Sequence, residues 1–103
     1  MELNMAFGQA LKLSRQAAGR TQEDFSPVCS RTYISQLERG LKSPTLEMLE
    51  ELSEVLGVHP VTLLAATYMR KDLLGAGELQ STLAHELKTL GFDASEECHG
   101  LGR

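Results

Sequence analysis

The chain has 103 residues, 42% of them hydrophobic, and a formal net charge of −4. This length suits a single domain with a tail, because one core commonly needs that much sequence. No apolar run approaches the roughly 20 residues of a membrane-spanning helix, and the N-terminal sequence lacks the basic flank and apolar centre of a signal peptide. These features predict a cytoplasmic protein with no membrane partner.

The first two predicted helices lie before the proline at position 27. Residues 4–18 place Phe7 and Leu11 at helical spacing and stop at Gly19, as expected of an amphipathic helix with a glycine cap. Thr21 and Asp24 have the spacing of a capping box, so a second helix begins at Gln22. Pro27 lacks an N–H group and ends this helix near residue 26.

Three further helices follow in close succession. Ser30 is a favourable N-cap for a third helix, Arg31–Arg39, which Gly40 ends. Thr45 caps a fourth helix, Leu46–Leu56, and His59-Pro60 begins a fifth that runs to residue 66 or beyond. The fourth helix is strongly amphipathic. Its predicted inward residues are Leu46, Leu49, Leu52, Val55 and Leu56, and its outer face carries Glu47, Glu50, Glu51 and Glu54.

The chain changes character after residue 66. Arg70–Leu74 extend the fifth helix, and Gly75 and Gly77 are expected to break it before a last amphipathic helix over residues 78–90. Its leucines, at positions 79, 83, 87 and 90, are spaced for packing either on the bundle or on another subunit, and periodicity alone does not identify which. We therefore divide the chain into a domain at 1–66, a helical extension for possible dimerisation at 67–91 and a flexible tail at 92–103.

The charge is unevenly distributed along the chain. Residues 9–44 contain six basic and three acidic residues, whereas residues 45–103 contain four basic and ten acidic ones. A basic block on an acidic chain is typical of a protein with one surface that faces anions.

The polar face of the third helix falls inside this basic block. A short helix, a tight corner and a second short helix are the helix-turn-helix signature, in which the second helix enters the major groove of DNA. Arg31 suits a bidentate contact with guanine and Gln36 with adenine, while Thr32 and Ser35 can bond several bases. Ile34 and Leu37 provide the narrow apolar edge that attaches the helix to the bundle.

The same residues resemble a known family. The motifs TQEDFS, SRTYISQLERG and SPTLEMLEELSEVLGV are similar to the phage-repressor-like (XRE) helix-turn-helix transcription regulators, over roughly residues 5–66. The resemblance implies an all-α fold: a compact five-helix helix-turn-helix DNA-binding domain, here followed by the C-terminal amphipathic helix. It also implies a homodimer on a palindromic operator in double-stranded DNA.

The resemblance assigns further roles by position. Gln22 would bond a phosphate from the start of the second helix, and Tyr33, Arg39 and Lys42 would approach the DNA backbone. Arg15 and Glu38 match a pair that forms an internal salt bridge between the first helix and the recognition helix.

The turn before the recognition helix departs from the family pattern. Eight residues separate Thr21 from Ser30, about two fewer than usual, and the corner Pro27-Val28-Cys29 contains no glycine. A left-handed glycine corner is therefore not available. We expect the second helix to be trimmed and the corner rerouted.

The leading functional prediction is a sequence-specific transcription regulator, a repressor, that acts by occupying its operator. The alternatives are an antitoxin whose C-terminal helix engages a protein partner, and an interaction module that has lost DNA binding. An enzyme is not expected, because three scattered histidines and ungrouped carboxylates assemble no active site. No cofactor is expected, and no metal, since Cys98-His99 supplies only two adjacent ligands.

Overall fold

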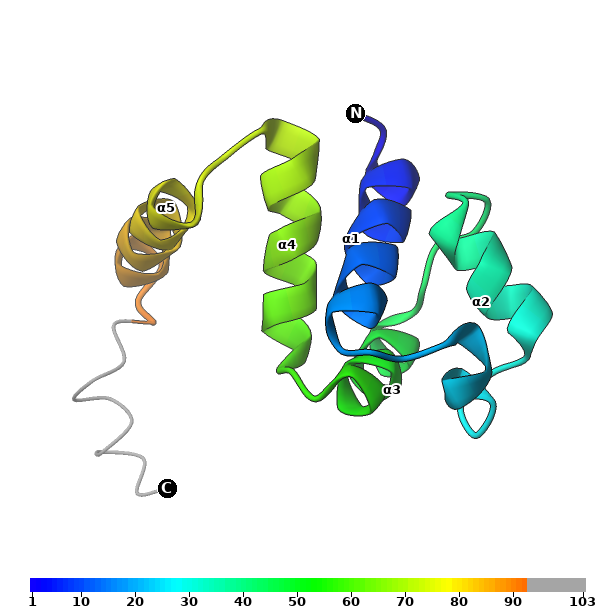
Figure 1. Ribbon diagram of the computed structural model, residues 1–103. Helices are drawn as coiled ribbons and strands as arrows, with labels where there is room; N and C mark the ends of the chain where they lie inside the picture. The colour runs from blue at the N-terminus through cyan, green and yellow to red at the C-terminus, as the bar shows by residue number, and fades with distance from the viewer. Residues whose placement is uncertain (93–103) are drawn as a thin grey trace, which may run out of the picture. The chain divides into compact units, whose positions relative to one another are not determined.

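The computed structural model describes residues 1–92 and contains only helices over that range (Figure 1). They are α1 (Leu3–Ala17), the 3₁₀ helix η1 (Gln22–Phe25), α2 (Arg31–Glu38), α3 (Leu46–Leu56), α4 (Pro60–Asp72) and α5 (Ala76–Thr89). The helices divide into two compact units, one of residues Met1–Leu73 and one that begins at Leu74. The all-α architecture with five helices in the first unit confirms the predicted fold class.

The helices begin where the sequence offers side-chain acceptors for their free N–H groups. The Ser30 hydroxyl accepts the Tyr33 N–H at 3.1 Å, and the Thr45 hydroxyl accepts the Met48 N–H at 3.0 Å. His59 caps α4 through Nδ1, which accepts the Val61 N–H at 3.0 Å. These bonds satisfy donors that have no partner inside the helix.

The core of the first unit lies where α1, α2, α3 and α4 meet. α1 packs along α4 and also against α2, as Figure 1 shows, while α3 packs against α4 and η1. The largest fully buried apolar side chains are Leu11, Phe25, Ile34, Leu37, Leu52 and Leu63. Ile34 and Leu37 are the apolar edge that the sequence predicts for the recognition helix, and both are completely buried.

The second helix is reduced to a single 3₁₀ turn. The Asp24 carboxylate accepts the Thr21 N–H at 2.8 Å, which fixes the start, and Phe25 is the one buried residue of η1. The carbonyl of Phe25 then accepts the N–H groups of both Val28 and Cys29, at 2.8 and 2.9 Å. No residue between Gly19 and Gly40 has a positive φ, so the chain turns into α2 without a left-handed corner.

Two sequence predictions need correction. Leu46 is 81% exposed rather than inward-facing, because it is the first residue of α3 and its side chain leans away from the packed turns. Gly77 does not break the chain but lies in the first turn of α5, where N–H groups lack intrahelical partners in any case. α4 continues to Asp72, in line with the predicted extension of the fifth helix past residue 66, and ends at Leu73 with φ of 56°.

The predictions for the C-terminal tail from residue 93 on, including those for Cys98-His99, lie outside the described residues. Among residues 1–92, none of the helices combines the length and apolar character needed to cross a bilayer. Over the same range, no three histidine, cysteine or acidic side chains cluster so that they could hold a metal ion.

Gly8 brings α1 against the C-terminal end of α2. A Cβ atom at this position would lie 2.5 Å from the carbonyl oxygen of Glu38 and 2.6 Å from that of Leu37. Both neighbours are backbone atoms, so they cannot rotate away as a side chain would. A residue with a side chain here would force the recognition helix away from α1.

Replacing Gly8 with alanine is therefore expected to lower the free energy of unfolding by about 1–3 kcal/mol, the usual cost of overpacking a core. Helix propensity alone predicts the opposite sign, a gain of about 1 kcal/mol. Urea unfolding followed by circular dichroism measures the difference. Gly77→Ala is the matched control, because a Cβ there meets nothing within 4 Å and should not destabilise the first unit. An unchanged or more stable Gly8→Ala protein would contradict the contact.

Candidate nucleic-acid interface

The polar face of α2 is the candidate interface. Arg31 and Thr32, at its first two positions, are exposed, while Ser35 and Gln36, one turn later, are half-buried. These four predicted base-reading residues recur at the spacing of one helical face. The opposite side of α2 holds the buried Ile34 and Leu37, so the helix presents one side and packs with the other.

An open depression gathers several of the predicted contact residues. It is lined by Gln22, Arg31, Thr32, Ser35 and Arg39, which come from η1, from α2 and from the residue that caps α2. Two guanidinium groups and three hydrogen-bonding side chains in one hollow form a surface suited to anionic, hydrogen-bonding ligands. Gln36, Tyr33 and Lys42 do not line it.

The predicted phosphate-contact residues occupy different environments. Arg39 and Lys42 are exposed, the latter in the loop after α2. Tyr33 is half-buried and packs against the core. The side chain of Gln22 is turned inward, where its Nε2 donates to Glu38 Oε1 at 3.1 Å. One of the two amide N–H groups of Gln22 is therefore bonded to Glu38 within the protein, a bond that the sequence does not predict.

Arg15 and Glu38 form the internal salt bridge that the family resemblance implies. Arg15 Nε donates to Glu38 Oε2 at 2.6 Å and Nη2 donates to Oε1 at 3.0 Å, a bidentate arrangement. The two side chains are 13% and 5% exposed. The hydrogen bond to Glu38 raises the pKa of the Arg15 guanidinium, against the opposing effect of burial.

This salt bridge is part of a larger network that links three segments. Arg15 Nη1 donates to the carbonyl oxygen of Arg20 at 3.1 Å, so the guanidinium also anchors the loop between α1 and η1. With the bond from Gln22, the Glu38 carboxylate accepts three hydrogen bonds, from α1 and from η1. The C-terminal end of α2 is thereby attached to both preceding helices.

Arg31 has a charged neighbour that the sequence analysis did not single out. Its Nη1 lies 3.7 Å from Glu23 Oε2, and the two side chains are 69% and 76% exposed. The pair joins the first turn of α2 to η1 across the turn. No local sequence signal predicts it, because the distance depends on how the shortened corner places the two segments.

Cys29, in the turn between η1 and α2, has the environment of a structural thiol. It is half-buried and packs against the core. Burial raises the pKa of the Cys29 thiol, and the nearby Glu51 carboxylate raises it further. Both effects disfavour the thiolate, which is the reactive form, so the geometry supports a turn residue rather than a nucleophile.

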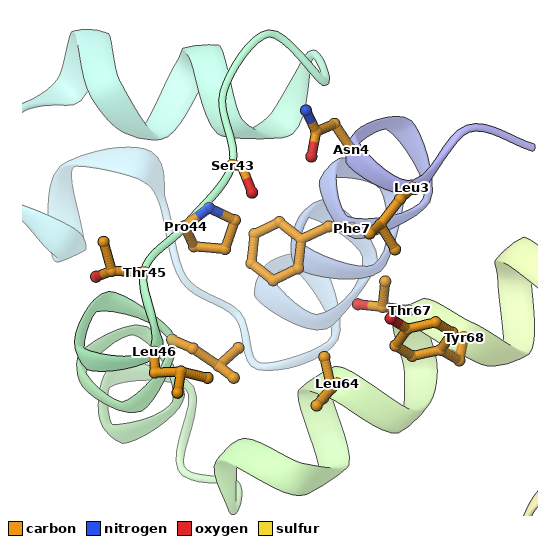
Figure 2. A pocket seen from close by; sticks show the side chains of 11 residues that line it. Leu3, Asn4, Phe7, Ser43, Pro44, Thr45, Leu46, Leu64, Thr67 and Tyr68 are labelled. Atoms are coloured by element: carbon orange, nitrogen blue, oxygen red, sulfur yellow. The ribbon is translucent and has the colours of Figure 1, made fainter.

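A second hollow lies away from the polar face and is mostly apolar. It has a volume of about 160 Å³ and opens among α1, the start of α3 and α4 (Figure 2). Phe7, Leu46 and Leu64 line it, together with the half-exposed Tyr68. Leu46, which the sequence predicts as a core residue, instead presents its side chain at this pocket.

Comparisons with known proteins agree with this geometry. The helix-turn-helix family model matches residues 11–63. Control protein C.BamHI of Bacillus amyloliquefaciens is 37% identical over 68 residues, which cover 63% of this chain and 84% of that protein. The uncharacterized HTH-type transcriptional regulator y4dJ of Sinorhizobium fredii is 36% identical over 69 residues, which cover 65% and 90% of the two chains.

A solved structure extends the similarity to the fold. The clp gene regulator ClgR of Corynebacterium glutamicum superposes with a TM-score of 0.66 at 28% identity, over 91% of this chain and 98% of that one. The family match covers all of the residues that line the polar depression on α2.

Removing the Glu38 carboxylate tests the network that positions α2. Glu38→Ala leaves the largely buried Arg15 guanidinium without its partner, so we expect the free energy of unfolding to fall by about 3 kcal/mol. Urea denaturation gives the value. Glu54→Ala removes an exposed carboxylate from α3 and is the control, expected to change stability by less than about 0.5 kcal/mol. Equal stability of the two variants would show that the salt bridge does not hold the recognition helix.

Proposed function

Because this chain belongs to the XRE-type helix-turn-helix family of transcription regulators, we propose that it is a sequence-specific repressor that binds a palindromic operator as a homodimer. In this proposal α2 enters the major groove, and Arg31, Thr32, Ser35 and Gln36 contact base edges. Gln22, Tyr33, Arg39 and Lys42 contact phosphates and set the register of the protein on the duplex.

The observation that carries the proposal is the division of α2 into a buried and a polar side. The polar side bears short or planar hydrogen-bonding groups, rather than the mixture of glutamate and lysine expected of a merely solvated helix. An eight-residue helix contributes little stability of its own. Its attachment through Glu38 and Gly8 supports a role in which the exposed face must be held at a fixed position.

Gln22 fits the proposal because its side-chain amide can donate to Glu38 and to a phosphate at the same time. Its Nε2 has two hydrogens, of which one is used by Glu38. The second hydrogen is available to a phosphate oxygen, so the same side chain can connect the DNA backbone with the carboxylate that positions α2. This role makes the phosphate contact sensitive to the internal network.

Repression follows from occupancy in this proposal. A two-fold symmetric dimer presents two copies of α2 to half-sites about one helical turn apart, roughly 34–36 Å. A bound dimer that overlaps a promoter excludes the transcription machinery. A reporter gene behind the chain's own upstream DNA measures the direction of regulation: repression requires that expression falls as the protein is supplied.

Substitutions at Gln36 and Lys42 separate base reading from phosphate binding. Gln36→Ala is expected to relax the preference at one base position, at a cost of about 1–3 kcal/mol on the preferred site. Lys42→Ala should weaken binding to all sequences alike. It should also reduce, by about one, the slope of the logarithm of the binding constant against the logarithm of the salt concentration. Sites selected from random DNA and mobility-shift titrations at several salt concentrations supply both quantities. A protein that binds no DNA at moderate salt would favour the interaction module instead.

The second unit supports the proposed dimer. None of the α5 residues is buried, and Leu83 and Leu87, one turn apart, are 40% and 45% exposed. With Leu79 and Leu90 they form an apolar stripe of near-heptad spacing, which suits pairing with the same helix of a second copy. An antitoxin is the second candidate function, since the same stripe would also suit a different protein partner.

Truncation after residue 76 tests this interface. We expect the full chain to sediment as a dimer and the truncated chain as a monomer with intact helical content, because the first unit contains its own core. Sedimentation velocity over a range of concentrations distinguishes the two. A truncated chain that stays dimeric would show that the dimer interface lies in the first unit. The apolar pocket in Figure 2 would then be the candidate surface for it. A full chain that is monomeric would contradict the homodimer.

A further inference from the structure

Glu23 is an acidic residue beside a surface proposed to bind DNA. Its Oε2 lies 3.7 Å from Arg31 Nη1, at the edge of the depression that Arg31 shares with Gln22 and Thr32. Among the described residues, the Glu23 side chain makes no hydrogen bond, whereas the neighbouring Asp24 caps the start of η1. Within residues 1–92, its only charged contact is the guanidinium of Arg31, a predicted base-reading residue.

We propose, on the basis of the DNA-binding function above, that Glu23 is a specificity-determining residue that directs the Arg31 guanidinium to a base edge and away from the phosphates. An arginine at the first position of a recognition helix has two competing partners in DNA. The O6 and N7 atoms of guanine identify the base, whereas phosphate oxygens carry no sequence information. A carboxylate on one side of the guanidinium fork restricts the directions in which the remaining N–H groups point.

Because Glu23 and Arg31 are both exposed, their attraction is weak in the free protein and becomes strong only in the complex with DNA. In free protein both side chains are mostly exposed, and a surface ion pair of this kind contributes little. DNA docked on α2 excludes water from the depression, and the attraction between two charges strengthens as the local dielectric constant falls. The carboxylate at the same time repels neighbouring phosphates. Arg31 is therefore held at Glu23 when it is closest to DNA.

The same electrostatics sets the sign of the coupling between the two residues. Glu23 without Arg31 would be an unpaired carboxylate under an anionic ligand, which is strongly unfavourable. The gain in affinity from Glu23→Gln should therefore be larger in an Arg31→Ala background than in wild-type protein. An uncoupled pair of residues would instead show additive effects.

The experiment compares Glu23→Gln with wild-type protein and with Glu50→Gln as the matched control. Glu50 is an exposed carboxylate on α3, outside the depression, so its replacement makes the same change in net charge. Sites are first selected from random DNA with wild-type protein. Affinities are then measured for the selected site, for each single-base variant and for random DNA, with circular dichroism to verify folding.

We expect Glu23→Gln to bind random DNA roughly fivefold tighter, because one repelling charge is removed. The preference for guanine at one position should fall roughly tenfold, to a level typical of an undirected contact. Glu50→Gln should leave that preference unchanged. In an Arg31→Ala background, Glu23→Gln should strengthen binding but no longer alter base preference.

Two outcomes overturn the role of Glu23. One is an unchanged base preference in Glu23→Gln, and the other is an equal change in Glu50→Gln, which would reduce the effect to net charge. A wild-type protein that selects no sequence would overturn the proposed function itself. The two failures are distinguishable, because the role of Glu23 is overturned only in experiments in which the wild-type protein does select a site.

Discussion

The Glu38 carboxylate is the group on which the geometry of the polar face depends. It accepts two hydrogen bonds from Arg15 and one from Gln22, so one side chain at the end of α2 connects that helix to α1 and η1. η1 is a single turn with one buried residue and cannot brace a neighbouring helix by packing alone. Polar contacts with fixed directions replace the apolar area that a longer second helix would bury.

The backbone of Glu38 is also constrained, by its contact with Gly8 of α1. Gly8 allows α1 to approach until there is no room for a Cβ beside the Glu38 carbonyl. Glu38 is thus held through its side chain by directional bonds and through its main chain by direct contact. Glycine within a helix is unfavourable by about 1 kcal/mol, and this close approach is the physical reason for it here. The two constraints together limit both the tilt of α2 and its distance from α1.

Features that depend on neighbouring residues in sequence were predictable, and features that depend on distances between segments were not. Ser30, Thr45 and His59-Pro60 mark helix starts because a cap bonds N–H groups two or three residues away. The exposure of Leu46, the 3₁₀ geometry of η1 and the pairing of Arg31 with Glu23 all depend on tertiary placement. Family resemblance supplied the Arg15–Glu38 pair but not the bond from Gln22, and the base and phosphate assignments stay predictions.

The acidic balance of the chain is compatible with DNA binding because recognition depends on the local field. α3 exposes Glu47, Glu50, Glu51 and Glu54, and the net charge is −4, so random encounters with a polyanion are disfavoured. Two of the ten lysine and arginine side chains, Arg31 and Arg39, line one depression with three neutral hydrogen-bonding side chains. Non-specific affinity comes almost entirely from phosphate contacts, and the negative net charge of the chain weakens it. Base contacts then account for a larger share of the total affinity, and a carboxylate such as Glu23 is tolerated at the interface because it improves discrimination at the expense of attraction.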